Sequence, residues 1–242
     1  MRSFRLCPLA LLLAAALSLP GQAAPLSNRR VLPSVVDPPT VFDSPLPASR
    51  PVSADWFSDA VFIGDSRTEE LLAAKLFPAG LALTQMGLNV RDVRSDAVFS
   101  WNGGRATLRQ MLEGSSYSKV YLMLGFHEAS WMDGEDFYTE YSLLIDELRS
   151  ILPGVPIYLQ TLLPVTVSRS AVRGPDNALL AEQNALLARL AQAKQVYLVR
   201  VDACFTETNG ALAPDLSSDG FHLAVQGNAR WFQYLRTHTI GS

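Results

Sequence analysis

Residues 60–67 read Ala-Val-Phe-Ile-Gly-Asp-Ser-Arg, a short apolar run that ends at a glycine and continues into polar residues. A run that is apolar on both faces is typical of a strand inside a parallel sheet that helices cover on both sides. The residues from Glu69 to Leu76 are compatible with a helix. This stretch therefore predicts the first strand-to-helix unit of an α/β fold.

The same pattern recurs along the chain. Apolar runs occupy residues 119–124, 156–163 and 196–201, and each is followed by a stretch that is compatible with a helix or a turn. Residues 137–152 place apolar side chains three and four positions apart, so one face of that helix is expected to pack on a core. Two further helices are expected at residues 179–190 and 224–236.

Two more segments have the character of strands. Residues 81–84 are predicted to form a strand, whereas residues 97–101 are compatible with a strand or with irregular structure. Together the elements predict a three-layer α/β/α sandwich with about five parallel strands. In such sheets the sites lie at the carboxyl ends of the strands, so the segments that follow the strands are the places to search.

The chain begins with the layout of a secretory signal peptide. Arg2 and Arg5 precede an apolar stretch from Pro8 to Leu19, and small residues follow at Gly21 and Ala23. We expect residues 1–23 to be this signal, and the alternative is a buried N-terminal helix. The chain is therefore expected to be secreted or extracytoplasmic, with the signal either cleaved or retained as an anchor.

Residues 24–53 are rich in proline, with seven prolines between Pro25 and Pro51. Such a stretch favours extended, solvated conformations, so it is interpreted as a linker that leads to a folded domain at residues 54–242. The alternative is a strap that packs over the domain surface, because the stretch also contains apolar residues such as Val41 and Phe42.

The composition excludes several classes of protein. With 48% hydrophobic and 18% charged residues among 242, the chain is not disordered, and no apolar run reaches the roughly 18 residues of a membrane-spanning helix. The 20 basic and 23 acidic residues are scattered, which argues against a nucleic-acid partner. Three separate histidines make no recognisable metal site, and Gly103-Gly104 is not part of a phosphate-binding loop. No cofactor or metal is expected, and the oligomeric state is not indicated.

Three strand ends carry residues with catalytic chemistry. Ser66 follows the first strand at a sharp turn, where the hydroxyl is exposed near the unpaired amides of a helix. Asp219 and His222 lie between the last strand and the last helix, and their spacing allows the carboxylate to orient the imidazole toward a hydroxyl. His127, after the second of the clear strands, is positioned to point into the same crevice.

Each of these residues also has a purely structural interpretation. Ser66 can cap the helix that follows it. Asp219 can be a helix N-cap, which leaves His222 as a surface residue. His127 can be a structural histidine that is hydrogen-bonded to Glu128 or to the backbone.

In combination, the segments resemble the SGNH hydrolases, also called the GDSL esterase family. Gly64-Asp65-Ser66 is similar to the block with the nucleophile, and Asp219-Gly220-Phe221-His222 to the block with the acid and the base. Gly87 stands where the second block has a glycine whose amide binds the oxyanion. The resemblance implies a flavodoxin-like sheet and metal-free ester hydrolysis. It assigns Ser66 as nucleophile, His222 as base and Asp219 as orienting acid.

One position departs from the family pattern. The third block normally has an asparagine that donates a hydrogen bond to the oxyanion, and His127 stands in its place. A neutral imidazole has one N–H to donate, so the expected oxyanion donors are the amides of Ser66 and Gly87 with the ring of His127. Loss of one such donor costs roughly 100–1000-fold in rate, so the alternative is a slow, specialised enzyme.

The expected function is that of an exported serine esterase that hydrolyses short acyl esters, with acetyl groups on carbohydrate as the suggested substrate. The alternatives are an O-acyltransferase that acts on a cell-envelope glycan and a non-catalytic carbohydrate-binding module. Candidates for the substrate pocket, which are equally compatible with core or rim positions, are Trp101, Phe126, Glu128, Trp131 and Tyr138.

Overall fold

A five-stranded parallel sheet forms the centre of the computed structural model, which describes residues 42–172, 174–206 and 210–240. Its strands are β1 (Ala60–Gly64), β2 (Leu81–Thr84), β5 (Lys119–Met123), β6 (Ile157–Gln160) and β7 (Tyr197–Val199), in the order β2-β1-β5-β6-β7. All residues of β1, β5 and β6 are buried, as expected for strands with helices on both faces. The prediction of an α/β fold with about five parallel strands, a strand at 81–84 included, is confirmed.

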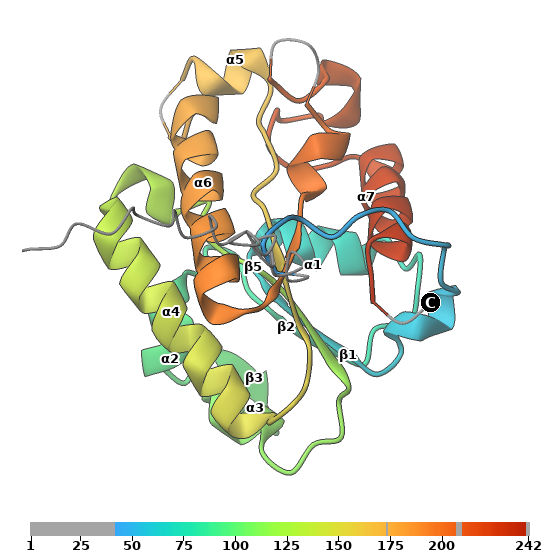
Figure 1. The fold of residues 1–242 in the computed structure, drawn as a ribbon. Coiled ribbons are helices and arrows are strands. Elements are labelled where there is room, and N and C mark those ends of the chain that lie inside the picture. Colours follow the sequence, from blue (N-terminus) through green and yellow to red (C-terminus); the bar gives the residue numbers. More distant parts are fainter. Residues whose placement is uncertain (1–41, 173, 207–209, 241–242) are drawn as a thin grey trace, which may run out of the picture. The chain divides into compact units, whose positions relative to one another are not determined.

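Helices cover both faces of this sheet (Figure 1). On one face α4 (Gly134–Ile151) packs against α2 (Val90–Ser95) and α6 (Asn177–Lys194), and on the other α1 (Ser66–Ala73) contacts α7 (Val225–Thr237). The predicted apolar face of α4 is buried at Phe137, Tyr141, Leu144, Ile145 and Leu148. Short helices complete the chain: α3 (Leu108–Leu112), α5 (Val167–Ser170), and the 3-10 turns η1 (Ala54–Phe57), η2 (Glu128–Ser130), η3 (Val201–Cys204) and η4 (Pro214–Leu216). In the described part of the chain, no helix combines the length and apolar character that crossing a membrane requires.

The sequence of residues 97–101 was compatible with a strand or with irregular structure, and part of this segment forms a small hairpin. Strand β3 (Phe99–Trp101) pairs antiparallel with β4 (Gly104–Ala106), apart from the central sheet. The two strands are joined by Asn102 and Gly103, whose φ angles are +47° and +78°. Positive φ at both central residues is the signature of the tight hairpin turn that Asn-Gly favours.

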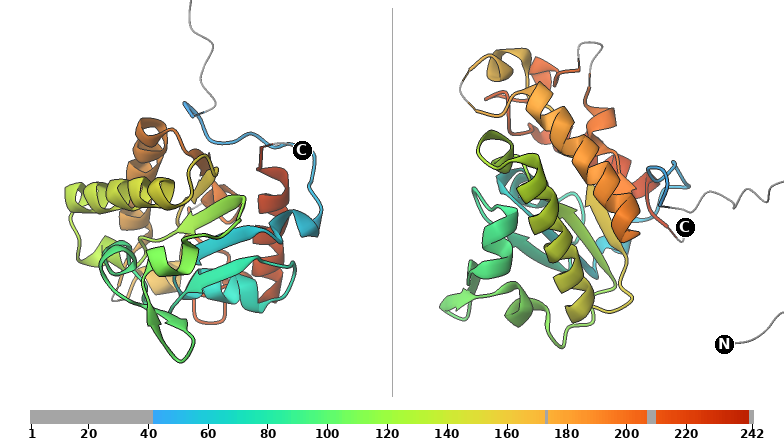
Figure 2. Two further views of the ribbon diagram at one scale, coloured as in Figure 1. Left: turned by 90° about the horizontal axis from the view of Figure 1, so that it is seen from below. Right: turned by 60° about the vertical axis from the view of Figure 1, so that its left-hand side comes forward.

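The end of the predicted linker belongs to the folded unit. Leu46 and Val52 are buried, and their amides donate to the carbonyls of Leu198 (2.8 Å) and Arg236 (2.9 Å). Residues 42–53 therefore form a strap on the domain, and the boundary that was expected at residue 54 is too late. Figure 2 shows this blue segment running along the domain beside the C-terminal helix. The predicted signal at 1–23 and the linker residues up to 41 lie outside the described residues.

Because all five strands are parallel, their carboxyl ends share one edge of the sheet. The segments that leave this edge start at Asp65 after β1, Gln85 after β2, Leu124 after β5 and Thr161 after β6. Since β1 lies between β2 and β5, the segments after those two strands flank Ser66 from both sides.

Candidate active site

The turn after β1 holds Ser66 as the first residue of α1. Asp65 is the N-cap, and its side chain accepts a hydrogen bond of 3.0 Å from the amide of Arg67. Gly64 permits the turn, because a Cβ there would lie 2.1 Å from Thr68 Oγ1 and 2.9 Å from the carbonyl oxygen of Met123. Ser66 is thus held by a buried strand, a capped helix and a close backbone contact.

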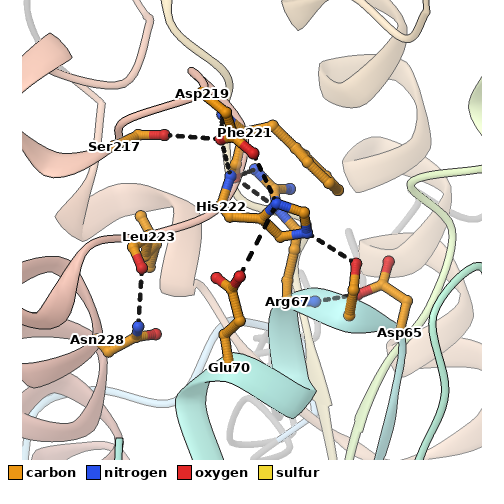
Figure 3. A network of polar contacts seen from close by, with 10 residues as sticks. Asp65, Arg67, Glu70, Ser217, Asp219, Phe221, His222, Leu223 and Asn228 are labelled. Atoms are coloured by element: carbon orange, nitrogen blue, oxygen red, sulfur yellow. Dashed lines mark hydrogen bonds and ion pairs between the residues drawn. The ribbon is translucent and has the colours of Figure 1, made fainter. Parts of the chain in front are cut away.

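Ser66, His222 and Asp219 form one hydrogen-bonded line. The Ser66 hydroxyl lies 3.0 Å from His222 Nε2, and His222 Nδ1 lies 2.7 Å from Asp219 Oδ2. Figure 3 shows the His222 ring beside the Asp219 carboxylate. The structure therefore brings together the three side chains that the sequence placed at two separate strand ends.

Asp219 is fixed by the turn that it begins. Its Oδ1 accepts hydrogen bonds from the amides of Phe221 (2.9 Å) and His222 (2.8 Å) and from the Ser217 hydroxyl (3.2 Å). Partial burial works to raise the pKa of Asp219, but these amides and the His222 ring outweigh it and lower the pKa to about 2. The carboxylate is therefore ionised at neutral pH and accepts from Nδ1–H, which leaves Nε2 free to take a proton from Ser66.

Gly220 allows this turn to approach its neighbours. Its φ is +80°, and an added Cβ would lie 2.5 Å from Thr166 Oγ1 and 2.8 Å from Arg169 Cβ. The Gly220 carbonyl also accepts a hydrogen bond of 3.0 Å from the amide of Thr166. The turn that carries His222 is thus packed against the segment that follows β6.

Glu70 supplies a second carboxylate near His222 that sequence reasoning did not identify. Its Oε1 lies 3.9 Å from His222 Nδ1, and Figure 3 shows its side chain on α1 reaching toward the ring. Burial raises the pKa of Glu70 above its ordinary value, and the nearby His222 opposes that rise. Glu70 stands four residues after Ser66 and therefore on the same face of the helix, and this spacing could have predicted its place near the site.

Arg67 is the second residue that sequence reasoning missed. Its guanidinium is buried and donates to the carbonyls of Leu163 (2.8 Å), Pro164 (2.9 Å) and Phe221 (3.1 and 3.2 Å). Burial lowers the pKa of Arg67 to about 10, against the attraction of Asp65 and Asp219. The side chain is therefore still a cation at neutral pH, in contact with the turn that carries Asp219 and His222.

Candidate oxyanion donors flank Ser66. Gly87 lies in a tight turn closed by a 3.1 Å hydrogen bond from Leu88 to Gln85, and its φ of +73° suits glycine. In the part of the chain that the structure describes, neither the amide of Ser66 nor that of Gly87 has a protein acceptor. His127 Nε2 is buried and has no partner among the same residues. The topology places Gly87 on the β2 side of Ser66 and His127 on the β5 side.

Two of the predicted pocket residues, Glu128 and Phe126, are buried. Glu128 is fully buried, its Oε1 accepts a 2.7 Å hydrogen bond from the amide of Val90, and burial raises its pKa to about 7. Phe126 is buried with its ring centre 4.2 Å from that of Phe221 and 4.7 Å from the Arg67 guanidinium carbon. Side chains from distant segments enclose both residues. Glu128 holds the start of α2, just after Gly87, and Phe126 covers Arg67.

The other pocket candidates lie nearer the surface. Trp101 and Trp131 are 53% and 54% exposed, and Trp131 lies 5.9 Å from the guanidinium of Arg91. Tyr138 is partly buried beside Arg189. A separate hollow of about 300 Å³ next to the Gly87 turn is lined by Glu69, Thr84, Gln85, Met86, Phe99 and Ser100 among others.

No group of three His, Cys, Asp or Glu side chains that could hold a metal ion occurs within residues 42–172, 174–206 and 210–240.

Solved structures with the same fold come from several bacteria. A Streptococcus pneumonia protein provisionally described as a platelet activating factor is 23% identical, with a TM-score of 0.61 over 73% of this chain and 81% of that one. The acetylxylan esterase Axe2 from Geobacillus stearothermophilus is 15% identical, with a TM-score of 0.52 over 73% and 91%. A peptidoglycan O-acetylesterase is 18% identical, with a TM-score of 0.51 over 64% of this chain and 45% of that one. At these identities the similarity shows the fold.

A search of curated protein sequences finds no match. The model of the GDSL-like lipase/acylhydrolase family, in contrast, matches residues 62–230, which include both ends of the hydrogen-bonded line. The resemblance seen in the sequence is confirmed: the chain belongs to the GDSL-like lipase/acylhydrolase family and is a serine hydrolase that acts on ester bonds.

Proposed function

We propose that this protein is an exported esterase that removes short acyl groups, foremost acetyl, from carbohydrate, with Ser66 as nucleophile, His222 as base and Asp219 as orienting acid. Export is supported by the character of residues 1–23. The choice of acetylated carbohydrate is supported by two proteins of the same fold, an acetylxylan esterase and a peptidoglycan O-acetylesterase.

The observation that carries the proposal is the line from Ser66 through His222 to Asp219. Its two spacings, 3.0 and 2.7 Å, are within hydrogen-bond distance, so proton transfer from the hydroxyl to the ring needs no rearrangement. The ionised carboxylate of Asp219 holds the ring and stabilises the imidazolium that forms. A serine without such a base is a weak nucleophile at neutral pH.

In the first half of the reaction, His222 Nε2 takes the proton of the Ser66 hydroxyl while Oγ attacks the ester carbonyl carbon. The negative charge that develops on the carbonyl oxygen is stabilised by the amides of Ser66 and Gly87 and by the Nε2–H of His127. The tetrahedral intermediate collapses when the carbon–oxygen bond to the sugar breaks. His222 returns the proton to the departing alcohol, which leaves an acetyl group on Ser66.

In the second half, water attacks the acetyl-Ser66 carbonyl and gives its proton to His222. The same donors bind the second oxyanion, acetate leaves, and Ser66 recovers its proton from His222. The unpaired amides of Ser66 and Gly87 and the unpaired ring nitrogen of His127 need no hydrogen bond to be broken before they act. Donors that are oriented in advance are the main reason such sites accelerate acyl transfer.

The test compares wild type with Ser66→Ala and with the control Ser95→Ala, whose exposed hydroxyl bonds only to the Arg91 carbonyl. We expect Ser66→Ala to lose at least about 10⁴-fold in kcat on p-nitrophenyl acetate, while Ser95→Ala matches wild type. A fluorophosphonate probe should label wild type at residue 66 and leave Ser66→Ala unlabelled. Equal turnover by wild type and Ser66→Ala would refute the proposed nucleophile.

The substrate class is tested with acetylated xylo-oligosaccharides, acetylated peptidoglycan fragments and longer-chain p-nitrophenyl esters, by acetate or fatty-acid release. We expect acetyl esters of sugars to be preferred. Release that is fastest from long-chain esters would contradict the substrate class but leave the mechanism intact. An acetylated glycan acceptor among the products would assign the protein to acyl transfer instead.

A further inference from the structure

The Arg67 side chain connects three parts of the site that are distant in the sequence. It follows Ser66 directly, only 2% of the residue is exposed, and its own amide is capped by Asp65. Its guanidinium reaches the segment after β6 and the turn that carries His222. The mechanism above gives Arg67 no role, so the burial of this cation needs a separate explanation.

The contacts of Arg67 with the β6 side are two hydrogen bonds to consecutive carbonyls. Nη1 donates to Leu163 (2.8 Å) and Nη2 to Pro164 (2.9 Å). The same segment is held from its other side by Asn177, whose side chain bonds both backbone groups of Val165. Arg67 is therefore anchored on a part of the backbone that is itself fixed.

Arg67 contacts the turn that carries His222 through one carbonyl, that of Phe221. Its Nε (3.2 Å) and Nη2 (3.1 Å) both donate to this oxygen. This carbonyl belongs to the peptide group whose N–H is the amide of His222, and that N–H donates to Asp219 Oδ1 at 2.8 Å. The peptide group is thus held at both ends, by a cation on the oxygen and a carboxylate on the nitrogen. Its orientation sets the direction in which the His222 side chain leaves the backbone.

The surroundings of the guanidinium suit a planar cation. Within the described residues no carboxylate lies within ion-pair distance of Arg67, so its charge is solvated mainly by carbonyl oxygens. The rings of Phe126 and Phe221 lie over it, with centres at 4.7 and 4.8 Å from the guanidinium carbon. A lysine has no rigid fork that can reach three carbonyls from two segments at once.

We propose that Arg67 is the positioning residue for the base, because it fixes the Phe221–His222 peptide group and thereby holds the His222 ring in line with Ser66. This inference rests on the proposed role of His222. Arg67 acts only through that peptide group and does not touch the reacting atoms. A displacement of the base of about 1 Å can reduce the rate about 100-fold, so removal of this support should affect kcat more than KM.

The experiment compares Arg67→Lys with the matched control Arg236→Lys. Arg236 also donates its Nε to a carbonyl, that of Val52 (2.7 Å), and lies over a ring, that of Phe232, but its partners belong to the strap and α7. On p-nitrophenyl acetate, below the melting transitions of both variants, we expect Arg67→Lys to lose about 10- to 100-fold in kcat with KM changed less than about threefold. Arg236→Lys should keep the kcat of wild type.

A second measurement does not depend on activity. Amide hydrogen exchange of His222 should accelerate in Arg67→Lys and remain as in wild type in Arg236→Lys. A folded Arg67→Lys with wild-type kcat and wild-type exchange at His222 would overturn the inference. If wild type itself shows no esterase activity, the proposed function fails while the exchange measurement still tests the role of Arg67.

If Arg67→Lys does not fold, proton exchange at Arg67 in the wild-type protein tests the inference instead. The Nε proton of Arg67 should exchange with solvent far more slowly than that of the exposed Arg109, because the Arg67 side chain is buried and its Nε–H donates to the Phe221 carbonyl. An Arg67 Nε proton that exchanges as fast as that of Arg109 would overturn the inference.

Discussion

The two halves of the site are built in opposite ways. Asp65 and Ser66 are buried between a strand of the central sheet and the helix that follows it. The side chains of His222 and Asp219 are 28% and 49% exposed, on a turn between η4 and α7. The proposed nucleophile, Ser66, is thus positioned by the core, whereas the proposed base, His222, is positioned by hydrogen bonds within its turn and by Arg67.

Because of this difference, substitutions in the two halves of the site should affect stability and activity in different proportions. A change near Ser66 disturbs the core, so it should cost stability and activity together. A change in the turn with the base removes local hydrogen bonds that are partly open to solvent, so it should cost activity with little change in stability. The predictions below test this division, from the largest expected effect to the smallest.

Asp219→Asn should reduce kcat about 10⁴-fold, because an amide cannot hold the ring in the tautomer that the base requires. The melting temperature should fall by only a few degrees, since the amide oxygen can still accept from the Phe221 and His222 N–H groups. Esterase assays and thermal unfolding measure both, with the exposed Asp215→Asn as control. A loss of less than about tenfold would show that Glu70, at 3.9 Å from the ring, replaces Asp219.

Gly64→Ala should destabilise the fold by about 3 kcal/mol, because the new methyl group would collide with Thr68 and with the backbone of β5. Gly220→Ala also introduces a collision, with Thr166 and Arg169, but on the turn with the base. We expect Gly220→Ala to lose a larger share of kcat relative to its loss of stability. Urea unfolding together with kcat gives this ratio for both variants, and equal ratios would contradict the division.

The titrations of Glu128 and Asp219 should change the stability of the fold in opposite directions as the pH rises. Burial raises the pKa of Glu128 from its usual 4.5 to about 7, so its folded form holds a proton that the unfolded chain has released, and stability falls from pH 4.5 to 7. Glu128→Gln should remove this fall, which amounts to roughly 3 kcal/mol at about 1.4 kcal/mol per pH unit. Unfolding at pH 4.5 and 7.5 measures it, and parallel curves for the two proteins would contradict it.

For Asp219 the sign reverses. Its pKa is lowered from 3.8 to about 2, so its contribution to stability is present above pH 3.8 and is lost as the pH falls toward 2. The stability difference between wild type and Asp219→Asn should therefore shrink over that range. Because the side chain is half exposed, this effect should be the smaller of the two.

The smallest effects are expected at the exposed aromatics. Trp131→Ala should change stability by less than about 0.5 kcal/mol, because the ring is half exposed and lies beside the Arg91 guanidinium at the surface. If the ring contacts the sugar, KM for acetylated oligosaccharides should rise severalfold while KM for p-nitrophenyl acetate stays constant. Trp101→Ala, on the hairpin, serves as the comparison, and a large loss of stability in either variant would contradict the prediction.

The sequence predicted the parts of the molecule that depend on local pattern. Strands such as 60–64 and 119–123 were visible because residues buried on both faces of a sheet must be apolar in succession. Ser66, Asp219 and His222 could be proposed because parallel strands bring their carboxyl ends to one edge, wherever those ends lie in the sequence. The Asn102-Gly103 turn was a local signal too, and it was overlooked.

What the sequence did not predict depends on which segments meet in space. The burial of Glu128 and Phe126 follows from α2 and from the turn with the base, and neither contact leaves a periodic pattern. The role of Arg67 is of the same kind, because its carbonyl partners come from two distant segments. An arginine after a candidate nucleophile is equally compatible with an exposed helix position.

The strap at residues 42–53 has a consequence for the order in which the molecule is completed. Its amides at Leu46 and Val52 bond to the carbonyls of Leu198, in β7, and Arg236, in α7, both far later in the chain. A ribosome releases those acceptors long after the strap, so a nascent chain carries an unattached strap until Arg236 has emerged. Closure by the strap is therefore a late event, and a chain truncated before Arg236 would lack the final helix turn to which Val52 bonds.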